Sequence, residues 1–176
     1  VSVSFAKKLS GLRIVSNIDL AGDIWNLDRE EKRPAFPARP VWKLDEAYTG
    51  MPAAEKLAQI RTDMQKEGAD VLLLSTLDDI AWLTNLRGDD IAYNPVFLSY
   101  MMISGQRAVL YRDINDVSVR EYLETQGIEM RAYNDFYCDV AKILPDMTVW
   151  MDETSASRRM EEAVPSGCNK IFKMNP

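Results

Sequence analysis

Apolar residues recur at helical spacing after Pro52, and this pattern predicts a helix that lies on a sheet. The apolar stripe of this helix consists of Ala53, Leu57, Ile60 and Met64. Its opposite side carries the charged residues Glu55, Lys56, Arg61, Asp63 and Lys66. Proline is tolerated in a first helical turn and Gly68 favours the left-handed conformation that ends a helix, so we expect the helix to run from residue 53 to Gly68.

Two further patterns predict the centre of the sheet. Residues 69–75 form an aliphatic run without polar alternation, too short for a second helix, which is typical of a strand covered on both faces. Residues 96–104 and 107–112 are also strand candidates. Gly105 and Gln106 join them in a two-residue connection, which favours a tight antiparallel hairpin.

A helix and a loop are expected between these strands. Thr76, with Asp79 three residues later, has the spacing of a capping box, which predicts a helix start. The apolar positions of this helix are Ile80, Leu83 and Leu86. Asn85 and Gly88 readily adopt the left-handed conformation that ends a helix, and a turn follows at residues 93–95 because proline restricts the residue before it.

Strand and helix alternate through the rest of the chain. We expect a helix capped by Asn115 and stopped by Gly127. Further strands are predicted over 128–132, 148–151 and 170–174, and further helices over 136–144 and 155–163. This alternation predicts an α/β fold, with a mixed, mostly buried β-sheet flanked by helices.

The first 44 residues differ in character from the rest. The elements predicted there are a helix over 2–11, a strand over 12–16, a helical segment over 19–25 and an extended segment over 41–44. Residues 26–40 are charged and contain three prolines, which is typical of an interdomain linker; a Pro-rich recognition peptide is the alternative. We therefore expect residues 1–44 to be the end of a preceding domain plus a Pro-rich linker, and residues 45–176 to form the α/β domain.

Composition narrows the possible functions. The 176 residues suffice for one full core, and 47% hydrophobic and 27% charged residues are ordinary for a globular protein. A net charge of −6 argues against a nucleic-acid surface, and no apolar run is long enough to cross a membrane. With no signal peptide and only Cys138 and Cys168, which we expect to be reduced thiols, the sequence predicts a cytoplasmic protein.

Two segments resemble a known family. Residues 77–91 read L-D-D-I-A-W-L-T-N-L-R-G-D-D-I and residues 94–100 read N-P-V-F-L-S-Y. Both resemble the second domain of three-domain X-prolyl aminopeptidases (aminopeptidase P), members of the creatinase/prolidase metallopeptidases. The resemblance implies a creatinase/prolidase N-terminal domain-like fold for residues 45–176, and a parent enzyme that removes the N-terminal residue before proline from a peptide.

The resemblance also carries expectations about cofactors and assembly. Such enzymes hold two divalent metal ions, of manganese type, through Asp, His and Glu side chains of a C-terminal catalytic domain, and a homodimer is expected. This sequence contains no histidine. We therefore expect no catalytic residue, no metal site and no cofactor within these residues.

Acidic residues are the first candidates for chemistry. Asp78, Asp79, Asp89 and Asp90 could act as paired carboxylates in acid/base catalysis, or as oxygen ligands of a metal ion. The alternative, which we favour, is that Asp78 and Asp79 stabilise a helix start and that the other two are solvated loop residues.

Arg87 is the stronger candidate for binding. Its guanidinium offers a rigid fork of donors suited to a peptide carbonyl or carboxylate. By the resemblance, Arg87, Asp89 and Asp90 would line the substrate entrance of the parent enzyme. The alternative is a salt bridge that fixes the loop or docks it on a catalytic domain.

Other candidates lack a partner for chemistry. Ser155, Ser157 and Ser166 have no histidine base and no nucleophile-elbow motif. A ligand-stacking set is conceivable for Trp42, Trp82, Trp150, Phe97 and Tyr100, but their spacing is more typical of a core or an interface.

Three functions are compared. The preferred hypothesis is a non-catalytic N-terminal part of an X-prolyl aminopeptidase that helps to shape the substrate cleft and contributes to dimer contacts. The alternative is a stand-alone α/β ligand-binding or protein-interaction module. A creatine- or creatinine-type hydrolase relative fits the fold but not the N-L-R-G-D-D-I segment. Coding sequence beyond Pro176 with spaced Asp, His and Glu would favour the first.

Overall fold

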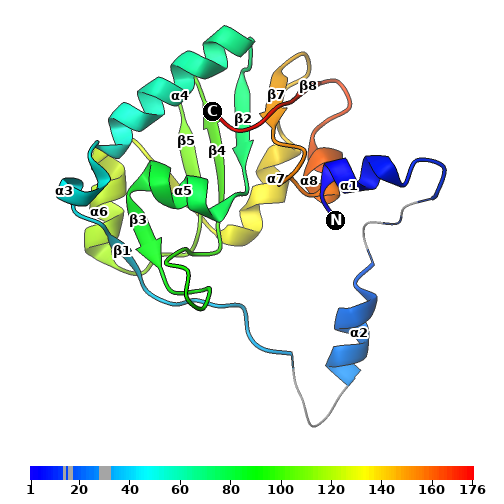
Figure 1. Ribbon diagram of the computed structural model, residues 1–176, viewed down its shortest axis with the longest axis horizontal. Coiled ribbons are helices and arrows are strands. Elements are labelled where there is room, and N and C mark those ends of the chain that lie inside the picture. Colours follow the sequence, from blue (N-terminus) through cyan, green and yellow to red (C-terminus); the bar gives the residue numbers. More distant parts are fainter. Residues whose placement is uncertain (14, 16–17, 28–32) are drawn as a thin grey trace.

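The computed structural model describes residues 1–13, 15, 18–27 and 33–176 (Figure 1). Its helices are α1 (Val3–Lys8), α2 (Leu20–Leu27), α3 (Glu46–Thr49), α4 (Ala53–Glu67), α5 (Leu77–Thr84), α6 (Val117–Thr125), α7 (Phe136–Val140) and α8 (Arg158–Ala163), with a 3-10 turn, η1 (Tyr133–Asp135). Its strands are β1 (Val41–Lys43), β2 (Val71–Leu74), β3 (Leu86–Gly88), β4 (Tyr100–Ser104), β5 (Ala108–Tyr111), β6 (Glu129–Arg131), β7 (Thr148–Met151) and β8 (Asn169–Phe172).

Six strands form one mixed sheet in the order β6-β5-β4-β2-β7-β8. β4 runs antiparallel to both of its neighbours, whereas every other neighbouring pair among these six described strands is parallel. All four residues of the central strand β2 are buried. The predicted α/β fold with a mixed, mostly buried sheet flanked by helices is therefore confirmed.

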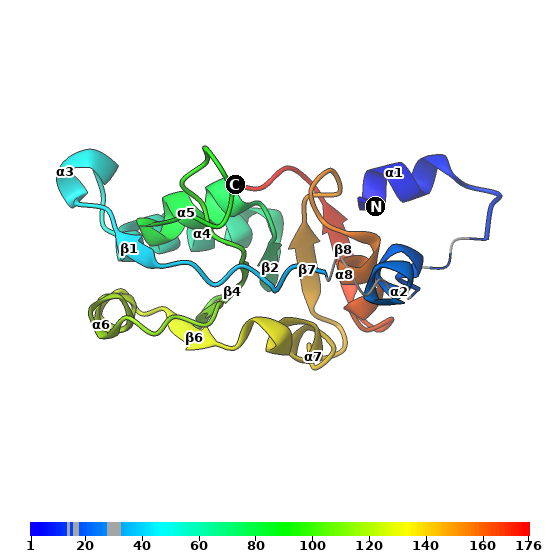
Figure 2. The same ribbon diagram turned by 90° about the horizontal axis from the view of Figure 1, so that it is seen from below.

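Alternate residues of the central strands face two separate cores. One face buries Leu72, Leu74, Met101, Ile103, Ala108, Leu110 and Trp150 against α4, α5 and α6. The other face buries Val71, Leu73, Val109, Tyr111, Val149 and Met151 against α1, α7 and α8. Figure 2 shows α4 and α5 on the opposite side of the sheet from α7. The period-2 alternation of side chains along a strand makes one sheet the shared wall of both cores.

Several predicted elements are confirmed almost to the residue. The helix over 53–67 ends at Gly68, which adopts φ +68°. The run at 69–75 contains β2, and β4 and β5 pair as an antiparallel hairpin across Gly105 and Gln106. Asn85 ends α5 with φ +55°, as its tolerance of the left-handed region predicts.

Other predicted boundaries of helices and strands were wrong. Leu86–Gly88 is not the end of a helix followed by a loop; it is strand β3, which pairs with β1 in a separate two-stranded sheet. The strand predicted over 96–104 begins only at Tyr100, and the helix predicted over 136–144 ends at Val140. Each error has the same cause: pairing and packing against distant segments decide where a short apolar run stops being regular.

Two predicted helix caps also differ from those in the structure. Asp116, not Asn115, caps α6, since its side chain accepts hydrogen bonds from the backbone N–H groups of Ser118 and Val119. Thr76 precedes α5 as expected but makes no side-chain cap; its hydroxyl accepts a hydrogen bond from the Asn175 side chain.

Lys56 was placed on the solvent side of α4, and the structure corrects this. Its side chain is only 2% exposed. The ammonium donates to the Trp82 carbonyl at 2.8 Å and to the Asn85 side-chain oxygen at 2.6 Å, and it lies 4.5 Å from the centre of the Trp82 ring. A long amphipathic stem can cross a helix face in this way and satisfy the last turn of a neighbouring helix.

The N-terminal segment joins the same body. The predicted helix over 2–11 is observed as α1, and Val3 is fully buried in the core that α7 and α8 cover. α1 lies beside α8 (Figure 1). The strand predicted over 12–16 includes residues 14 and 16, and the linker predicted over 26–40 includes residues 28–32; these positions lie outside the described residues.

Candidate functional site

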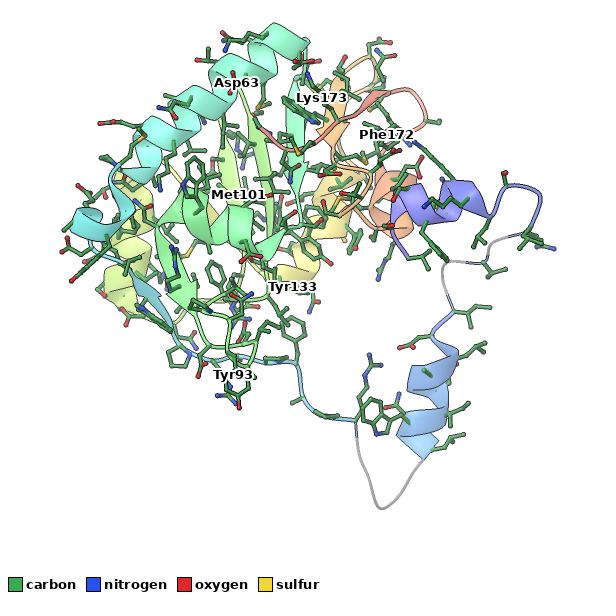
Figure 3. All side chains as sticks on the ribbon, in the orientation of Figure 1. Asp63, Tyr93, Met101, Tyr133, Phe172 and Lys173 are labelled. Carbon is green, nitrogen blue, oxygen red and sulfur yellow. The ribbon has the colours of Figure 1, made fainter. Side chains whose placement is uncertain are left out.

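Of the predicted binding residues, Asp89 and Asp90 lie on the loop between β3 and β4, whereas Arg87 lies in β3 and not on the loop where it was expected. This loop folds back on itself, since the backbone N–H of Gly88 donates to Pro95 at 3.3 Å and that of Asp90 donates to Val96 at 3.2 Å. A Cβ atom at Gly88 would come within 2.7 Å of the Cβ of Phe97, so only glycine permits this approach. Tyr93 lies at the outer end of the loop with φ +64° and a fully exposed side chain (Figure 3).

Asp90 is a buried residue that holds this loop in place, so the expectation that it is a solvated loop residue is wrong. Its carboxylate is 0% exposed and forms an ion pair with Arg112 at 3.1 Å, and the Arg112 side chain is 3% exposed. The same carboxylate accepts hydrogen bonds from the backbone N–H groups of Leu98, at 2.8 Å, and Arg39, at 3.1 Å. The carboxylate is thus saturated by contacts within the chain.

Arg112 ties a second segment to the same point. Its guanidinium donates to the backbone carbonyls of Pro37, at 3.0 Å, and Arg39, at 3.2 Å. The end of the Pro-rich segment is therefore held against the loop by the residue that pairs with Asp90. Arg112 was not among the predicted site residues; the signal for it in the sequence is an arginine directly after the apolar run of β5.

Asp89 has the opposite environment from its neighbour. Its side chain is 61% exposed and pairs with the equally exposed Arg39 at 3.1 Å. Such a pair contributes little to stability because water screens both charges. Of the two loop aspartates, Asp89 is therefore the one that a molecule from outside can reach.

The exposure of Arg87 lies between that of the exposed Asp89 and that of the buried Asp90. Its side chain is half-buried and donates to the backbone carbonyls of Ala81 and Leu86, both at 2.8 Å. On the paired strand β1 its register partner is Trp42. Burial lowers the pKa of Lys56, and the positive charge of Arg87 lowers it further.

The described residues do not include a set of side chains that could bind a metal ion. Among the described residues, no group of three or more His, Cys, Asp or Glu side chains could hold a metal ion. Asp79 accepts a hydrogen bond from the Asn175 side chain at 2.8 Å, and Asp78 stands in the first turn of α5. The residues present do not fit a di-nuclear centre.

Several of the remaining candidates have structural roles in the described chain. The Ser157 hydroxyl caps α8, and the Ser155 hydroxyl donates to a backbone carbonyl. Trp150 and Phe97 are core residues, and Tyr100 stacks on Phe136 with ring centres 4.2 Å apart. Trp42 and Trp82 stay almost half exposed.

The fold and this loop define a class: an α/β domain with a mixed six-stranded sheet, whose charged loop is built around a buried Asp–Arg pair. The profile of the Creatinase/Prolidase N-terminal domain matches residues 32–176. The chain belongs to this family.

The similar proteins found by sequence include several described as Xaa-Pro aminopeptidases. The chain is 42% identical over 132 residues to the probable Xaa-Pro aminopeptidase P of Sordaria macrospora, a match that covers 74% of this chain and 21% of the relative. It is 39% identical over 111 residues to the Xaa-Pro aminopeptidase 1 of Dictyostelium discoideum, covering 61% of this chain and 17% of that protein. The chain thus spans about a fifth of the length of these curated relatives.

Solved structures support the same fold. The X-prolyl aminopeptidase of Caenorhabditis elegans, described as a cytosolic enzyme with a di-nuclear active site, superposes with a TM-score of 0.77 at 22% identity, covering 89% of this chain and 26% of that one. The N-terminal creatinase/prolidase-like domain of a Corynebacterium diphtheriae protein matches with a TM-score of 0.51 at 13% identity, covering 69% of this chain and 95% of that one.

Proposed function

We propose that these residues are the non-catalytic N-terminal part of an X-prolyl aminopeptidase, a metallopeptidase that removes the N-terminal residue before proline. The observation that carries the proposal is the 42% identity over 132 residues to a protein described as Xaa-Pro aminopeptidase P. In this proposal the catalytic domain follows Pro176 and supplies two divalent metal ions of manganese type, which would activate water for peptide hydrolysis. No step of that chemistry is assigned to this chain.

The role proposed for this chain is to shape the substrate cleft. Asp89 and Arg87 would face the entrance and meet peptide groups, because the Asp89 side chain is exposed and Arg87 is only half-buried. Asp90 would act indirectly, since its buried carboxylate holds the loop that carries Asp89 and follows Arg87. The division into residues 1–44 and 45–176 is part of the same proposal.

The activity is tested on the complete gene product. We expect it to cleave an X-Pro peptide, to lose this activity with a chelator and to regain it with added divalent metal, whereas the 176-residue chain alone cleaves nothing. Hydrolysis by the 176-residue chain would refute the non-catalytic role. A stop codon shortly after Pro176 would favour the stand-alone binding module instead.

The cleft role is tested by Asp89→Asn in the complete protein. We expect KM for an X-Pro peptide to rise several-fold with little change in kcat, because the exposed carboxylate would affect substrate entry rather than the reacting atoms. Asp63→Asn is the matched control, since the Asp63 side chain is also partly exposed, at 43%, and pairs with a cation, Lys66, at 2.7 Å. Identical kinetic constants in the two variants would contradict the proposal that Asp89 lines the substrate entrance.

Assembly and location complete the proposal. A homodimer is proposed for the complete protein and is measured by light scattering during size-exclusion chromatography. Cytoplasmic location is proposed because the relative from C. elegans is described as cytosolic. Among the described residues, no helix is long and apolar enough to cross a membrane.

A further inference from the structure

The end of the Pro-rich segment is bound to the α/β domain at successive residues. The centre of the Phe36 ring lies 4.6 Å from that of the Tyr133 ring. The backbone carbonyls of Pro37 and Arg39 both accept hydrogen bonds from the Arg112 guanidinium. A solvated polyproline linker makes no such specific backbone contacts. This end of the segment therefore has a fixed position on the domain.

The loop after β3 is held at the same point. The Asp90 carboxylate accepts hydrogen bonds from the backbone N–H groups of Leu98, at 2.8 Å, and Arg39, at 3.1 Å. The Arg112 guanidinium donates to the same carboxylate at 3.2 Å. One buried ion pair thus joins the loop to the Pro-rich segment, although Arg39 and Asp90 are 51 positions apart in sequence.

A second link between the loop and the segment is exposed to water. Arg39 pairs with Asp89 at 3.1 Å, but the two side chains are 63% and 61% exposed. Water screens such a pair, so it contributes little to holding the two segments together. The buried pair of Asp90 and Arg112 is therefore the main link.

This link requires the geometry of a guanidinium. Nη1 and Nη2 of Arg112 reach three acceptors, namely the carbonyls of Pro37 and Arg39 and the Asp90 carboxylate. An arginine presents several donors in a rigid planar fork, whereas a lysine offers one compact charge. Lysine at this position would keep a positive charge beside Asp90 but would not reach both carbonyls.

We propose that Arg112 is a positioning residue, which makes the Pro-rich segment and the loop that carries Asp89 move as one unit. A displacement of the segment then displaces the loop. The position of the segment would thereby set the position of Asp89 at the substrate entrance. This last step rests on the proposed function, whereas the coupling itself does not.

The coupling is tested in the 176-residue chain by hydrogen exchange followed by mass spectrometry. Phe36→Ala changes only the segment, and the readout is the loop at residues 89–98. We expect the loop to exchange about threefold faster or more, because the Leu98 amide loses protection when the segment loosens. Phe5→Ala is the matched control, since Phe5 is 50% and Phe36 51% exposed, but Phe5 lies on α1. Equal exchange of the loop in the two variants would overturn the coupling.

Arg112→Lys tests whether the guanidinium carries the coupling. We expect the loop to exchange faster in this variant, and Phe36→Ala added to it to cause no further change, because the link is already broken. Arg131→Lys is the control, since Arg131 also forms an ion pair but its side chain is 39% exposed. A full additional effect of Phe36→Ala in the Arg112→Lys chain would refute the role of Arg112.

Kinetic constants of the complete protein distinguish positioning from a purely structural role. Arg112→Lys should raise KM for an X-Pro peptide several-fold with little change in kcat, as expected for Asp89→Asn, whereas Arg131→Lys should change neither constant. An unchanged KM in an active Arg112→Lys protein would refute the positioning role. If the unmodified complete protein cleaves no X-Pro peptide, the proposed function fails, and the exchange experiments still decide the coupling.

Discussion

Adjacent residues of the same type have opposite roles in the loop after β3. Asp89 and Asp90 both pair with an arginine at 3.1 Å, but the Asp89 side chain is 61% exposed and the Asp90 side chain is 0% exposed. Removing one partner from a buried pair leaves an uncompensated charge, whereas an exposed charge is rehydrated. The energetic consequence of each residue therefore differs by several kcal/mol.

Asp90→Ala should lower the free energy of unfolding by about 3–5 kcal/mol, because Arg112 would stay buried without its carboxylate. Asp89→Ala should lower it by less than about 1 kcal/mol. Urea unfolding followed by circular dichroism measures both. Similar losses in the two variants would contradict the assigned burial.

Asp139 links stability to pH. Burial acts to raise the pKa of its carboxyl, but hydrogen bonds from Lys142 and Tyr111 and the charge of Arg131 outweigh this, so the pKa lies below its ordinary value. The unfolded chain then binds more protons than the native chain at acid pH. The stabilisation is complete above the unfolded pKa, about 3.9, and is lost as pH falls through the lower native pKa.

Asp139→Asn should therefore destabilise the protein at neutral pH by about 1–3 kcal/mol and should make its stability less dependent on pH. We expect the difference from the unchanged protein to shrink below about pH 4. Urea midpoints measured between neutral and acid pH give both curves. Parallel curves over the whole range would show that Asp139 has an ordinary pKa in the native state.

At the scale of elements, α1 packs against the core on the sheet face that α7 and α8 cover. The backbone N–H of Val3 donates to Ala156 at 2.9 Å and that of Ser4 donates to Glu153 at 2.8 Å. Lys7 also pairs with Glu153. A helix of only 6 residues is not stable by itself in water, so these tertiary contacts hold it in place.

Val3→Ala should lower the free energy of unfolding by about 1–2 kcal/mol, since a fully buried valine loses part of its apolar area and leaves a small cavity. Val1→Ala is the control, because Val1 is 71% exposed and should change stability by less than about 0.5 kcal/mol. Equal stability of the two variants, measured by urea unfolding, would place α1 outside the folded body.

At the scale of the whole molecule, two cores share one wall. β2 and β4 each contribute alternate side chains to both. Loss of either core would expose the sheet that supports the other. The two cores should therefore not unfold independently.

The unfolding of α1 together with residues 33–176 is accordingly expected to be a single cooperative transition. Far-ultraviolet circular dichroism reports the helices and strands, and near-ultraviolet circular dichroism reports the packing of Tyr111, Phe136 and Trp150. The two urea curves should coincide. Separate midpoints would show that the cores are independent units.

Local sequence patterns correctly predicted those helices and strands whose apolar pattern lies entirely within the element itself. The apolar stripe of α4, the aliphatic run of β2 and the left-handed residues Asn85 and Gly68 are examples. Each depends on interactions between residues a few positions apart, so the sequence alone contains the information. Asp89 and Asp90 lie on a loop as predicted, but Arg87 lies in β3. A salt bridge that fixes the loop was one of the two alternatives considered, but the burial of the pair and its cation, Arg112, were not predicted.

The sequence by itself determined the α/β class, the central strand, the main helix and, through the segments at 77–91 and 94–100, the family. Tertiary structure alone decided that Leu86–Gly88 pairs with Val41–Lys43, that Lys56 is buried, and that of two neighbouring aspartates only one reaches solvent. Spacing along the chain fixes which side chains share a face. Burial of a charge depends on partners such as Asn85 and Arg112, which lie 29 and 22 residues away in sequence.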